Sequence, residues 1–564
     1  MVKCIQKGLI ALFCICAYSY KKAPAEAYNI AVSSYNLVMR SLFHYPAFKP
    51  LTLLLLGALG VLGFAPFYWY LASVLSLIGL FYFWHLSQSP KQAALAGFIY
   101  GLGLFGAGIY WIYISLHEFG GMPSLMAGLL TFLLCAFLAL FPAVVGALSV
   151  WASGVSLTSK QTHTMLLTIP VSWALTDWVR SWIFTGFPWL SIGYSQVPSS
   201  PLAGYMPIIG VYGVSLLTVF SASLLGFWLA KHFIHKENTL RWQRNAIALL
   251  FFIWGTGGLL KLVEWTAPNG KPISIALLQG NIAQNLKWIP EIAEQTLVLY
   301  LKMAESSSAQ LIVMPETALP VLSSEVPLAL KARLQIHAKK NQGDILVGLV
   351  ELENGEYFNS VLSLGTAPSE IYRKSHLVPF GEFIPLKSAL GWVYRDLLDM
   401  PLSDLSRGAT HQQPMSIAGQ QVALNICYED VFGEEVIRQL PQATLLVNVS
   451  NDAWYGESIA ADQHLQFSQA RALETGRMVL RATNTGATAI IDPHGNLIAQ
   501  APHFTQFTLN GMAQGYRGTT PYVRWGNWLF LGICLIIILF LVRTKLRTLT
   551  KSPPKGLVSK HKTK

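Results

Sequence analysis

The segment QVALNICYED, residues 421–430, carries an apolar stretch directly into one cysteine and two carboxylates. A short apolar run bounded by polar residues is typical of a strand that is buried on both faces. Six further segments have this character: PISIALLQGNI (272–282), AQLIVMPE (309–316), GDILVGLVEL (343–352), NSVLSLG (359–365), ATLLVNVSND (443–452) and TAIIDPHG (488–495). Helix-like segments alternate with them, among them LALKARLQIHAKKNQ (328–342) and QFSQARALETGRMVLRAT (466–483). The alternation predicts one layered α/β domain over residues 265–522.

The rest of the chain is strongly apolar. The 564 residues are 53% hydrophobic and only 12% charged, and the mean hydropathy is +0.43, which is typical of a membrane protein. Eight apolar runs approach the length that crosses a bilayer: 51–67, 70–84, 93–116, 122–152, 165–179, 202–230, 246–263 and 528–542. We therefore predict a polytopic α-helical membrane domain of eight transmembrane helices, seven before the α/β block and one after it.

The basic residues indicate how these helices are oriented. Lys and Arg follow the second, fourth and sixth runs, and the tail after the eighth run is rich in both and has no acid. Because basic loops stay in the cytoplasm, both termini are expected there and the α/β block outside it. The net charge of +12 is thus explained by membrane orientation and by anionic lipid head groups, and no nucleic-acid partner is expected.

The first residues allow two interpretations. The segment MVKCIQKGLIALFCICAYSYKKAPAEA (1–27) has the character of a signal peptide. Cleavage there would invert every later loop against the charge pattern, so we favour an uncleaved cytoplasmic extension or a start at Met39. The expected parts are the extension (1–45), a seven-helix transmembrane domain (46–264), the α/β domain (265–522), a final helix (523–543) and a basic cytoplasmic tail (544–564).

Three reactive side chains stand at or just after an apolar segment: Glu316, Lys374 and Cys427. Strand ends hold functional side chains on a rigid frame. Each residue alone is weak evidence, since loop acids and lysines are usually solvated and a single cysteine is usually a small buried hydrophobe. Apart from Cys427, the cysteines lie in apolar segments or near the N-terminus, so neither a disulfide framework nor a zinc site is expected.

Together the three residues resemble the Glu-Lys-Cys triad of the nitrilase superfamily. Combined with the membrane helices, the chain resembles one family within it, the apolipoprotein N-acyltransferases. The motifs that carry this resemblance are RSWIFTGFPWLSIGYSQ (180–196), LQGNIAQNLKW (278–288), HLVPFGEFIP (376–385), ICYED (426–430), SNDAWYG (450–456) and RATNTGATAIIDPHG (481–495). The resemblance implies an α-β-β-α sandwich outside the cytoplasm, in the periplasm, and a location in the bacterial inner membrane. It also implies a phospholipid acyl donor, a diacylglyceryl apolipoprotein acceptor, no cofactor and a monomer.

The chemistry of the triad can be argued beside the resemblance. A free thiol has a pKa near about 8.5, so little thiolate is present at pH 7, and Glu429 and Asp430 are expected to reduce that fraction further. Glu316 is the candidate base, and Lys374 is the candidate cation for the oxyanion of each tetrahedral intermediate. Cys427 would take an acyl chain from phospholipid as a thioester and pass it to the acceptor's α-amine.

Other residues match family positions with supporting roles. Glu382 and Glu429 would orient the triad, with solvated loop acids as the alternative, and Tyr428 and Asn359 would shape the pocket, with core packing as the alternative. Large apolar side chains are expected where an acyl chain enters, although they could equally anchor the protein at the membrane interface: Trp288, Phe380, Phe383, Trp392 and Trp454. Asp177 and Arg180 are expected to form a local ion pair.

Two other functions remain open. A membrane-tethered amidase of the nitrilase type would share the triad and pass its acyl group to water, but it would not need a seven-helix half with the FTGFPW motif. A transporter with an outer sensing domain would place several ionisable residues inside its helices. Intramembrane charges are few here and lie near helix ends, so this alternative is remote.

Overall fold

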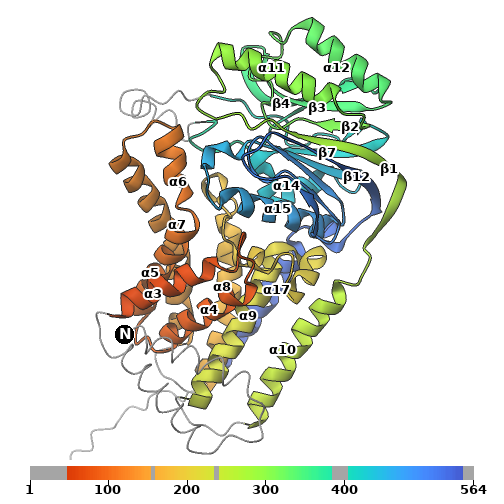
Figure 1. Ribbon diagram of the computed structural model, residues 1–564. Helices are drawn as coiled ribbons and strands as arrows, with labels where there is room; N and C mark the ends of the chain where they lie inside the picture. The colour runs from red at the N-terminus through yellow and green to blue at the C-terminus, as the bar shows by residue number, and fades with distance from the viewer. Residues whose placement is uncertain (1–47, 154–158, 234–239, 384–403, 551–564) are drawn as a thin grey trace, which may run out of the picture.

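The computed structural model describes residues 48–153, 159–233, 240–383 and 404–550, and it divides into a helical half and a sandwich of two sheets (Figure 1). The predictions for residues 1–45, for the end of the tail and for Trp392 lie outside the described residues. Each of the eight apolar runs overlaps a helix: α3 (Phe48–Val61), α4 (Tyr70–His85), α5 (Pro90–Gly108), α7 (Ser124–Ser153), α8 (Ser159–Arg180), α9 (Met206–Phe233), α10 (Leu240–Leu260) and α17 (Trp528–Thr550).

Not all of these helices are equally long and apolar. In the described part of the chain three segments have the length and composition to cross a membrane: Ser124–Ser153, Pro201–Leu229 and Trp528–Leu546. A fourth is added if α5 and the segment Trp111–Phe119, bent by 53° at the break between them, count as one span. The helices α3 and α4 are apolar but shorter, because the chain turns between them.

The α/β block forms two six-stranded sheets. The first sheet has the order β12-β1-β2-β3-β4-β5, with bounds Phe507–Gly518, Thr266–Gln279, Leu311–Val313, Asp344–Glu353, Glu356–Gly365 and Ile371–Arg373. The second has the order β11-β10-β9-β8-β7-β6, with bounds Leu497–Gln500, Ala489–Ile491, Val479–Thr483, Leu445–Ser450, Gln420–Ile426 and Met415–Ile417. Strands β1-β2-β3 and β7-β8-β9 pair in parallel, so within each trio the carboxyl ends share one edge of the sheet.

Helices cover the outer face of each sheet (Figure 1). The helices α11 (Pro290–Glu305) and α12 (Leu328–Lys340) pack on the first sheet, and α14 (Gly433–Val436) and α15 (Ala460–Thr475) pack on the second. Apolar side chains of both sheets, such as Ile275, Val313, Leu424 and Val447, fill the space between them. The layers are therefore α-β-β-α, as expected.

One predicted element was wrong in its extent. Residues 466–483 were expected to continue as one helical segment, but the helix α15 ends at Thr475 and strand β9 begins at Val479. The cause is Gly476, which caps the helix in the left-handed conformation, with φ +63°, and redirects the chain. All five residues of the following strand are buried, so its sequence does not show the alternation of apolar and polar residues that is typical of a strand.

The helix α15 lies between the two halves of the molecule. Every one of its residues except Asp462 is buried, although its sequence is rich in polar side chains. Three glutamines at three-residue spacing bond to irregular backbone or side chains of the helical half: Gln463 Nε2 donates to Gly108 O (3.1 Å), Gln466 Nε2 to Val197 O (2.8 Å), and Gln469 Oε1 accepts from Tyr68 Oη (3.1 Å). The helices of the helical half are interrupted at these points. The glutamines of α15 therefore supply hydrogen-bond partners that the backbone of the helical half would otherwise lack.

Candidate active site

Glu316 lies in the turn after β2, with its side chain buried. Its carboxylate accepts a hydrogen bond from Asn359 Nδ2 at 2.7 Å and from the backbone N–H of Asn451 at 2.9 Å. Lys374 Nζ approaches the same carboxylate at 3.3 Å. The carboxylate is thus fixed in place by donors from both sheets.

Lys374 follows β5 directly and is 1% exposed. Burial disfavours its ammonium, but Glu382 and Glu316 outweigh burial, and the pKa of Lys374 is raised above its usual range. Glu382 Oε1 accepts from Lys374 Nζ at 2.9 Å and from Asn359 Nδ2 at 3.0 Å. The side chains of Glu316, Asn359, Lys374 and Glu382 therefore form one connected group, and its ammonium stays charged.

Cys427 follows β7 directly and opens a short 3-10 helix, Cys427–Val431. Its φ is +52°, a strained value for a residue with a side chain and one that recurs at functional sites. Burial is the largest effect that raises the pKa of its thiol; Glu316 and Asp452 raise it further, and Lys374 lowers it. The thiol is protonated at neutral pH, and Glu316 and Lys374 are both close enough to affect its ionisation.

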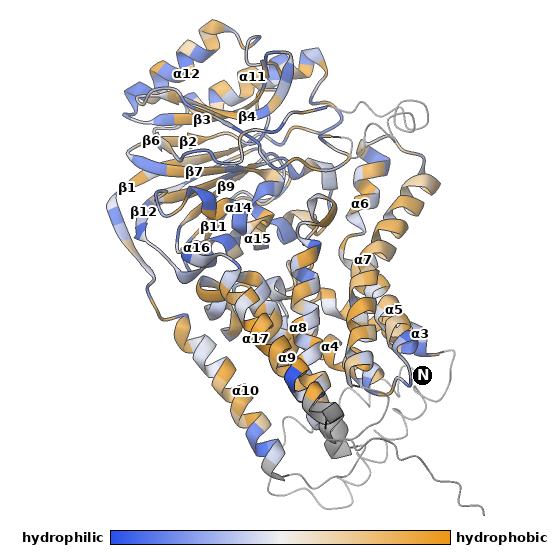
Figure 2. Ribbon diagram, turned by 180° about the vertical axis from the view of Figure 1, so that it is seen from behind, coloured by the Kyte–Doolittle hydropathy of each residue, from blue (hydrophilic) through white to orange (hydrophobic). Residues whose placement is uncertain are grey.

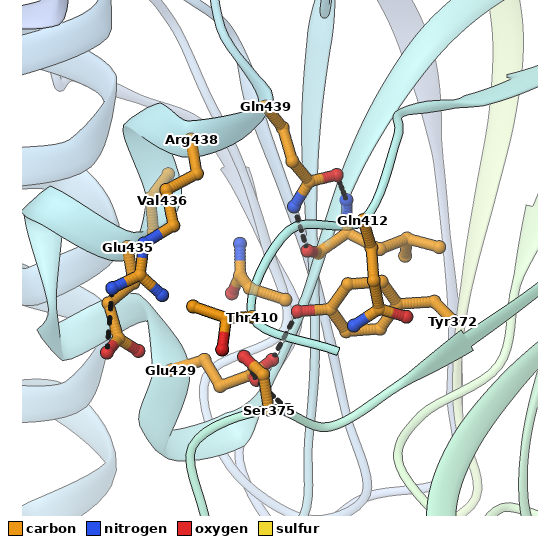
Figure 3. A pocket seen from close by; sticks show the side chains of 11 residues that line it. Tyr372, Ser375, Thr410, Gln412, Glu429, Glu435, Val436, Arg438 and Gln439 are labelled. Carbon is orange, nitrogen blue, oxygen red and sulfur yellow. Dashed lines mark hydrogen bonds and ion pairs between the residues drawn. The ribbon is translucent and has the colours of Figure 1, made fainter. Parts of the chain in front are cut away.

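The sequence predicted that Glu429 and Asp430 reduce the thiolate fraction of Cys427. The carboxylates that raise the pKa of the thiol most are instead Glu316 and Asp452. Glu429 lines a small cavity together with Tyr372, Ser375 and other side chains (Figure 3). Its two oxygens accept bonds from Ser375 N (2.6 Å), Ser375 Oγ (2.9 Å), His376 N (3.1 Å), Tyr372 Oη (3.0 Å) and Ile426 N (2.7 Å). Glu429 thus ties the Lys374 loop to the end of β7, and burial raises its own pKa.

Asp430 belongs to a second buried group, with His464, Asp452 and Arg481. The imidazole of His464 contacts Asp452 Oδ1 at 2.8 Å and Asp430 Oδ1 at 2.9 Å. Arg481 contacts the other oxygen of each carboxylate, at 2.8 and 3.2 Å. The charges of the two acids are therefore compensated inside this group.

One set of side chains within the described residues has a spacing that suits a metal ion. Cys427, Asp452 and His464 offer ligand atoms that all lie within 4.8 Å of one another, and thiolate, imidazole and carboxylate are zinc ligands. Both nitrogens of His464 already face carboxylates, and the thiol is protonated, so a metal would have to displace both arrangements. The donor set does not fit a resident metal.

Tyr428 connects the cysteine to the helical half. Its hydroxyl donates to Gly186 O at 2.8 Å, and its ring stacks on that of Trp189 at 6.5 Å between centroids. Both partners lie in the segment 180–196, where Arg180 also forms the expected ion pair with Asp177 at 3.0 Å. Tyr428 is thus a core residue of the junction, next to the thiol.

The predicted substrate-binding aromatics are largely exposed. Trp288 is 52%, Phe380 49% and Trp454 40% exposed. Phe383 is partly covered, with the guanidinium of Arg407 at 5.2 Å from its ring centre. They stay candidates for contact with lipid.

Sequence reasoning missed several residues of the site. Lys287 is 2% exposed and donates from Nζ to the Glu316 carbonyl at 3.3 Å and to the Thr317 hydroxyl. Burial lowers its pKa to about 8. His464 and Arg481 were missed too. Lys287 and Arg481 lie in the motifs LQGNIAQNLKW and RATNTGATAIIDPHG, so a basic residue inside a motif of the resemblance was the available indication.

The sandwich, with a carboxylate, an ammonium and a thiol near the strand ends, defines a protein of the carbon-nitrogen hydrolase class, and the family description "Carbon-nitrogen hydrolase" matches residues 274–514. A second description, "Apolipoprotein N-acyltransferase N-terminal domain", matches residues 56–224. The chain belongs to the apolipoprotein N-acyltransferase family, as its relatives show.

Two relatives illustrate this membership. The apolipoprotein N-acyltransferase of Nitrosomonas europaea is 49% identical over 494 residues, which are 87% of this chain and 96% of that protein. That of Methylococcus capsulatus is 43% identical over 486 residues, 86% of this chain and 93% of that protein. Among solved structures, a carbon-nitrogen hydrolase superfamily protein of Xanthomonas campestris matches with a TM-score of 0.34 and 16% identity, covering 43% of this chain and 91% of its own.

Proposed function

We propose that this protein transfers an acyl chain from a phospholipid, through a thioester on Cys427, to the α-amine of the N-terminal S-diacylglyceryl-cysteine of apolipoproteins. The observation that carries the proposal is the convergence of Glu316 and Lys374 near Cys427, at the junction with an apolar helical half. Membership in the family, whose members are named for N-acylation of apolipoproteins, supports the same reaction.

In the first half-reaction the Cys427 sulfur attacks the acyl carbonyl of the phospholipid. Glu316 takes the thiol proton as the S–C bond forms, and the ammonium of Lys374 stabilises the oxyanion. The ester C–O bond then breaks, the proton passes from Glu316 to the leaving oxygen, and a lysophospholipid departs. A protonated resting thiol fits this scheme, since the base acts during the attack rather than before it.

In the second half-reaction the α-amine of the acceptor attacks the thioester carbonyl. Glu316 accepts a proton from the attacking nitrogen, and Lys374 again faces the oxyanion. The C–S bond breaks, the sulfur recovers the proton, and an amide product leaves a free Cys427. The amine succeeds over water only if the site stays dry, which burial of all three side chains favours.

The supporting roles follow from the contacts. Glu382 and Asn359 orient Lys374 and Glu316, and Glu429 orients the loop that carries Lys374. Trp288, Phe380, Phe383 and Trp454 would contact the acyl chains of the substrates or the membrane interface.

The helical half would place this site in the bacterial inner membrane, with eight crossings, both termini in the cytoplasm and the sandwich in the periplasm. The ribbons of α7, α10 and α17 are coloured mostly as hydrophobic residues, whereas those of α11 and α12 mix hydrophobic and hydrophilic residues (Figure 2). Several of the apolar side chains are strongly exposed: Leu125, Phe251, Phe252 and Ile536. A hydrocarbon environment accounts for such exposure. The parts would be those expected at 1–45, 46–264, 265–522, 523–543 and 544–564, in a monomer.

The test supplies acyl-labelled phospholipid to the purified full chain, first alone and then with a synthetic diacylglyceryl-cysteine peptide. We expect a thioester-linked acyl mass on Cys427 in the first step and labelled peptide amide in the second, and neither in the Cys427→Ala variant. Release of all label to water, with none on the peptide, would establish the amidase instead. Normal transfer by the Cys427→Ala variant would exclude a cysteine mechanism, and the transporter alternative predicts no acyl product at all.

A further inference from the structure

A fully buried imidazole lies beside the reactive cysteine, and the triad does not use it. His464 is 1% exposed, and three oxygens surround its ring: Asp452 Oδ1 at 2.8 Å from Nδ1, Asp430 Oδ1 at 2.9 Å from Nε2, and Cys427 O at 3.1 Å from Nε2. All three oxygens are acceptors, and each ring nitrogen faces a carboxylate.

This arrangement requires the charged form of the ring. A neutral imidazole carries one N–H, so one of its nitrogens would face a carboxylate with lone pair against lone pair. With both nitrogens protonated, two cations, His464 and Arg481, balance two anions, Asp430 and Asp452. Burial and Arg481 oppose that charge, but the two carboxylates outweigh them and raise the pKa of His464 to about 9.

The backbone carbonyl of Cys427 is an uncharged hydrogen-bond partner of the His464 imidazole. The strained φ of Cys427, +52°, must be maintained by surrounding contacts, because a side-chain-bearing residue leaves that region readily. Two side chains hold its carbonyl: Asn448 Nδ2 at 3.2 Å and His464 Nε2 at 3.1 Å. An imidazole atom also lies within 4.8 Å of the sulfur.

We propose that the His464 imidazolium is a positioning residue for acyl transfer, which fixes the strained Cys427 turn through its carbonyl and places a second positive charge beside the sulfur. The proposal rests on the acyltransferase function above. It assigns two positive charges to the surroundings of the thiol, Lys374 and His464. The groups that face the imidazole are Asp430, Asp452, Arg481 and the ring of Trp189, whose centre is 5.8 Å away.

The test measures alkylation of Cys427 by iodoacetamide against pH in the full-length protein without phospholipid, so that it does not depend on any acyl transfer. Removing a positive charge beside a thiol makes its thiolate harder to form. We expect His464→Gln to move the midpoint of alkylation to higher pH and to slow thioester formation by about tenfold or more. Removing a negative charge with Asp452→Asn should move the midpoint the other way.

Ser468→Ala is the matched control. Ser468 lies on the same helix as His464 and donates to the same Asp430, but it carries no charge and does not contact the Cys427 carbonyl. Its alkylation midpoint should stay at the wild-type value. A folded His464→Gln protein with an unchanged midpoint would overturn the proposal.

If His464→Gln does not fold, His464→Asn supplies the uncharged side chain instead, and a folded His464→Asn protein with an unchanged midpoint would overturn the proposal. Failure of the proposed function would look different, since wild-type protein would then alkylate with the expected pH dependence and still form no acyl thioester.

Discussion

The two halves of the sandwich contribute to one site in different ways. The first sheet and its loops supply Glu316 and Lys374, and its outer helix α12 turns one face to solvent, with Leu328 83% exposed. The second sheet supplies Cys427, and its outer helix α15 is buried at every residue except Asp462. The outer helices of the first half pack through apolar side chains, whereas the half that packs on the helical half also buries many polar side chains, among them Gln463, His464 and Arg481.

The largest expected effect is loss of the base that the first half provides. Glu316→Gln keeps the shape of the side chain and an oxygen that can accept from Asn359, but it cannot take a proton. We expect thioester formation to fall by about 10⁴-fold, at the upper end of general-base contributions. Rapid-quench measurement of acyl-enzyme from labelled phospholipid checks this. The exposed Glu294→Gln on α11 is the control and should react at the wild-type rate.

The residues of the triad were singled out from sequence for a physical reason. Apolar strands end in reactive residues, which made Glu316 and Cys427 candidates, each weak alone, and the resemblance to the nitrilase superfamily joined them with Lys374. Lys287 was not predicted, because a lysine beside a tryptophan is typical of the protein surface, and its burial is known only from the structure. His464 was not predicted either, because the polar sequence of its helix is typical of a helix at the surface, whereas α15 is almost fully buried.

The second prediction concerns the pH dependence of the second half. The pKa of His464 is raised to about 9 in the folded protein from an ordinary value of about 6.5. A raised pKa stabilises the fold fully below the unfolded value, and this contribution is lost as pH rises through the folded value. The stability advantage of wild type over His464→Gln should therefore be greatest below pH 6.5 and shrink through pH 9.

Denaturant unfolding in detergent at a series of pH values measures that advantage. The exposed-face variant Leu328→Ser supplies the baseline, since Leu328 contacts no titratable group of the buried cluster. An advantage that grows between pH 7 and 9 would show that the ring is neutral in the folded protein.

A smaller effect is expected where α15 meets the helical half. Gln463 Oε1 accepts from the indoles of Trp189 (2.7 Å) and Trp111 (3.2 Å), while its Nε2 donates to Gly108 O. Gln463→Leu leaves these three buried groups unpaired, and we expect a loss of about 1–3 kcal/mol in the free energy of unfolding. The corresponding change in the other half, Gln335→Leu on the half-buried side of α12, should cost much less. Equal losses would remove the distinction between the halves.

The smallest effect belongs to the solvent-facing surface of α12. Leu328→Ser changes a side chain that is 83% exposed, and surface substitutions of this kind stay within about 0.5 kcal/mol. Thermal unfolding and acyl transfer should both match wild type. A larger loss of stability would mean that this face is covered in the working enzyme, by a second copy or by another protein. The first half would then be enclosed like the second, and the difference between them would lie in what covers each helix rather than in how each is built.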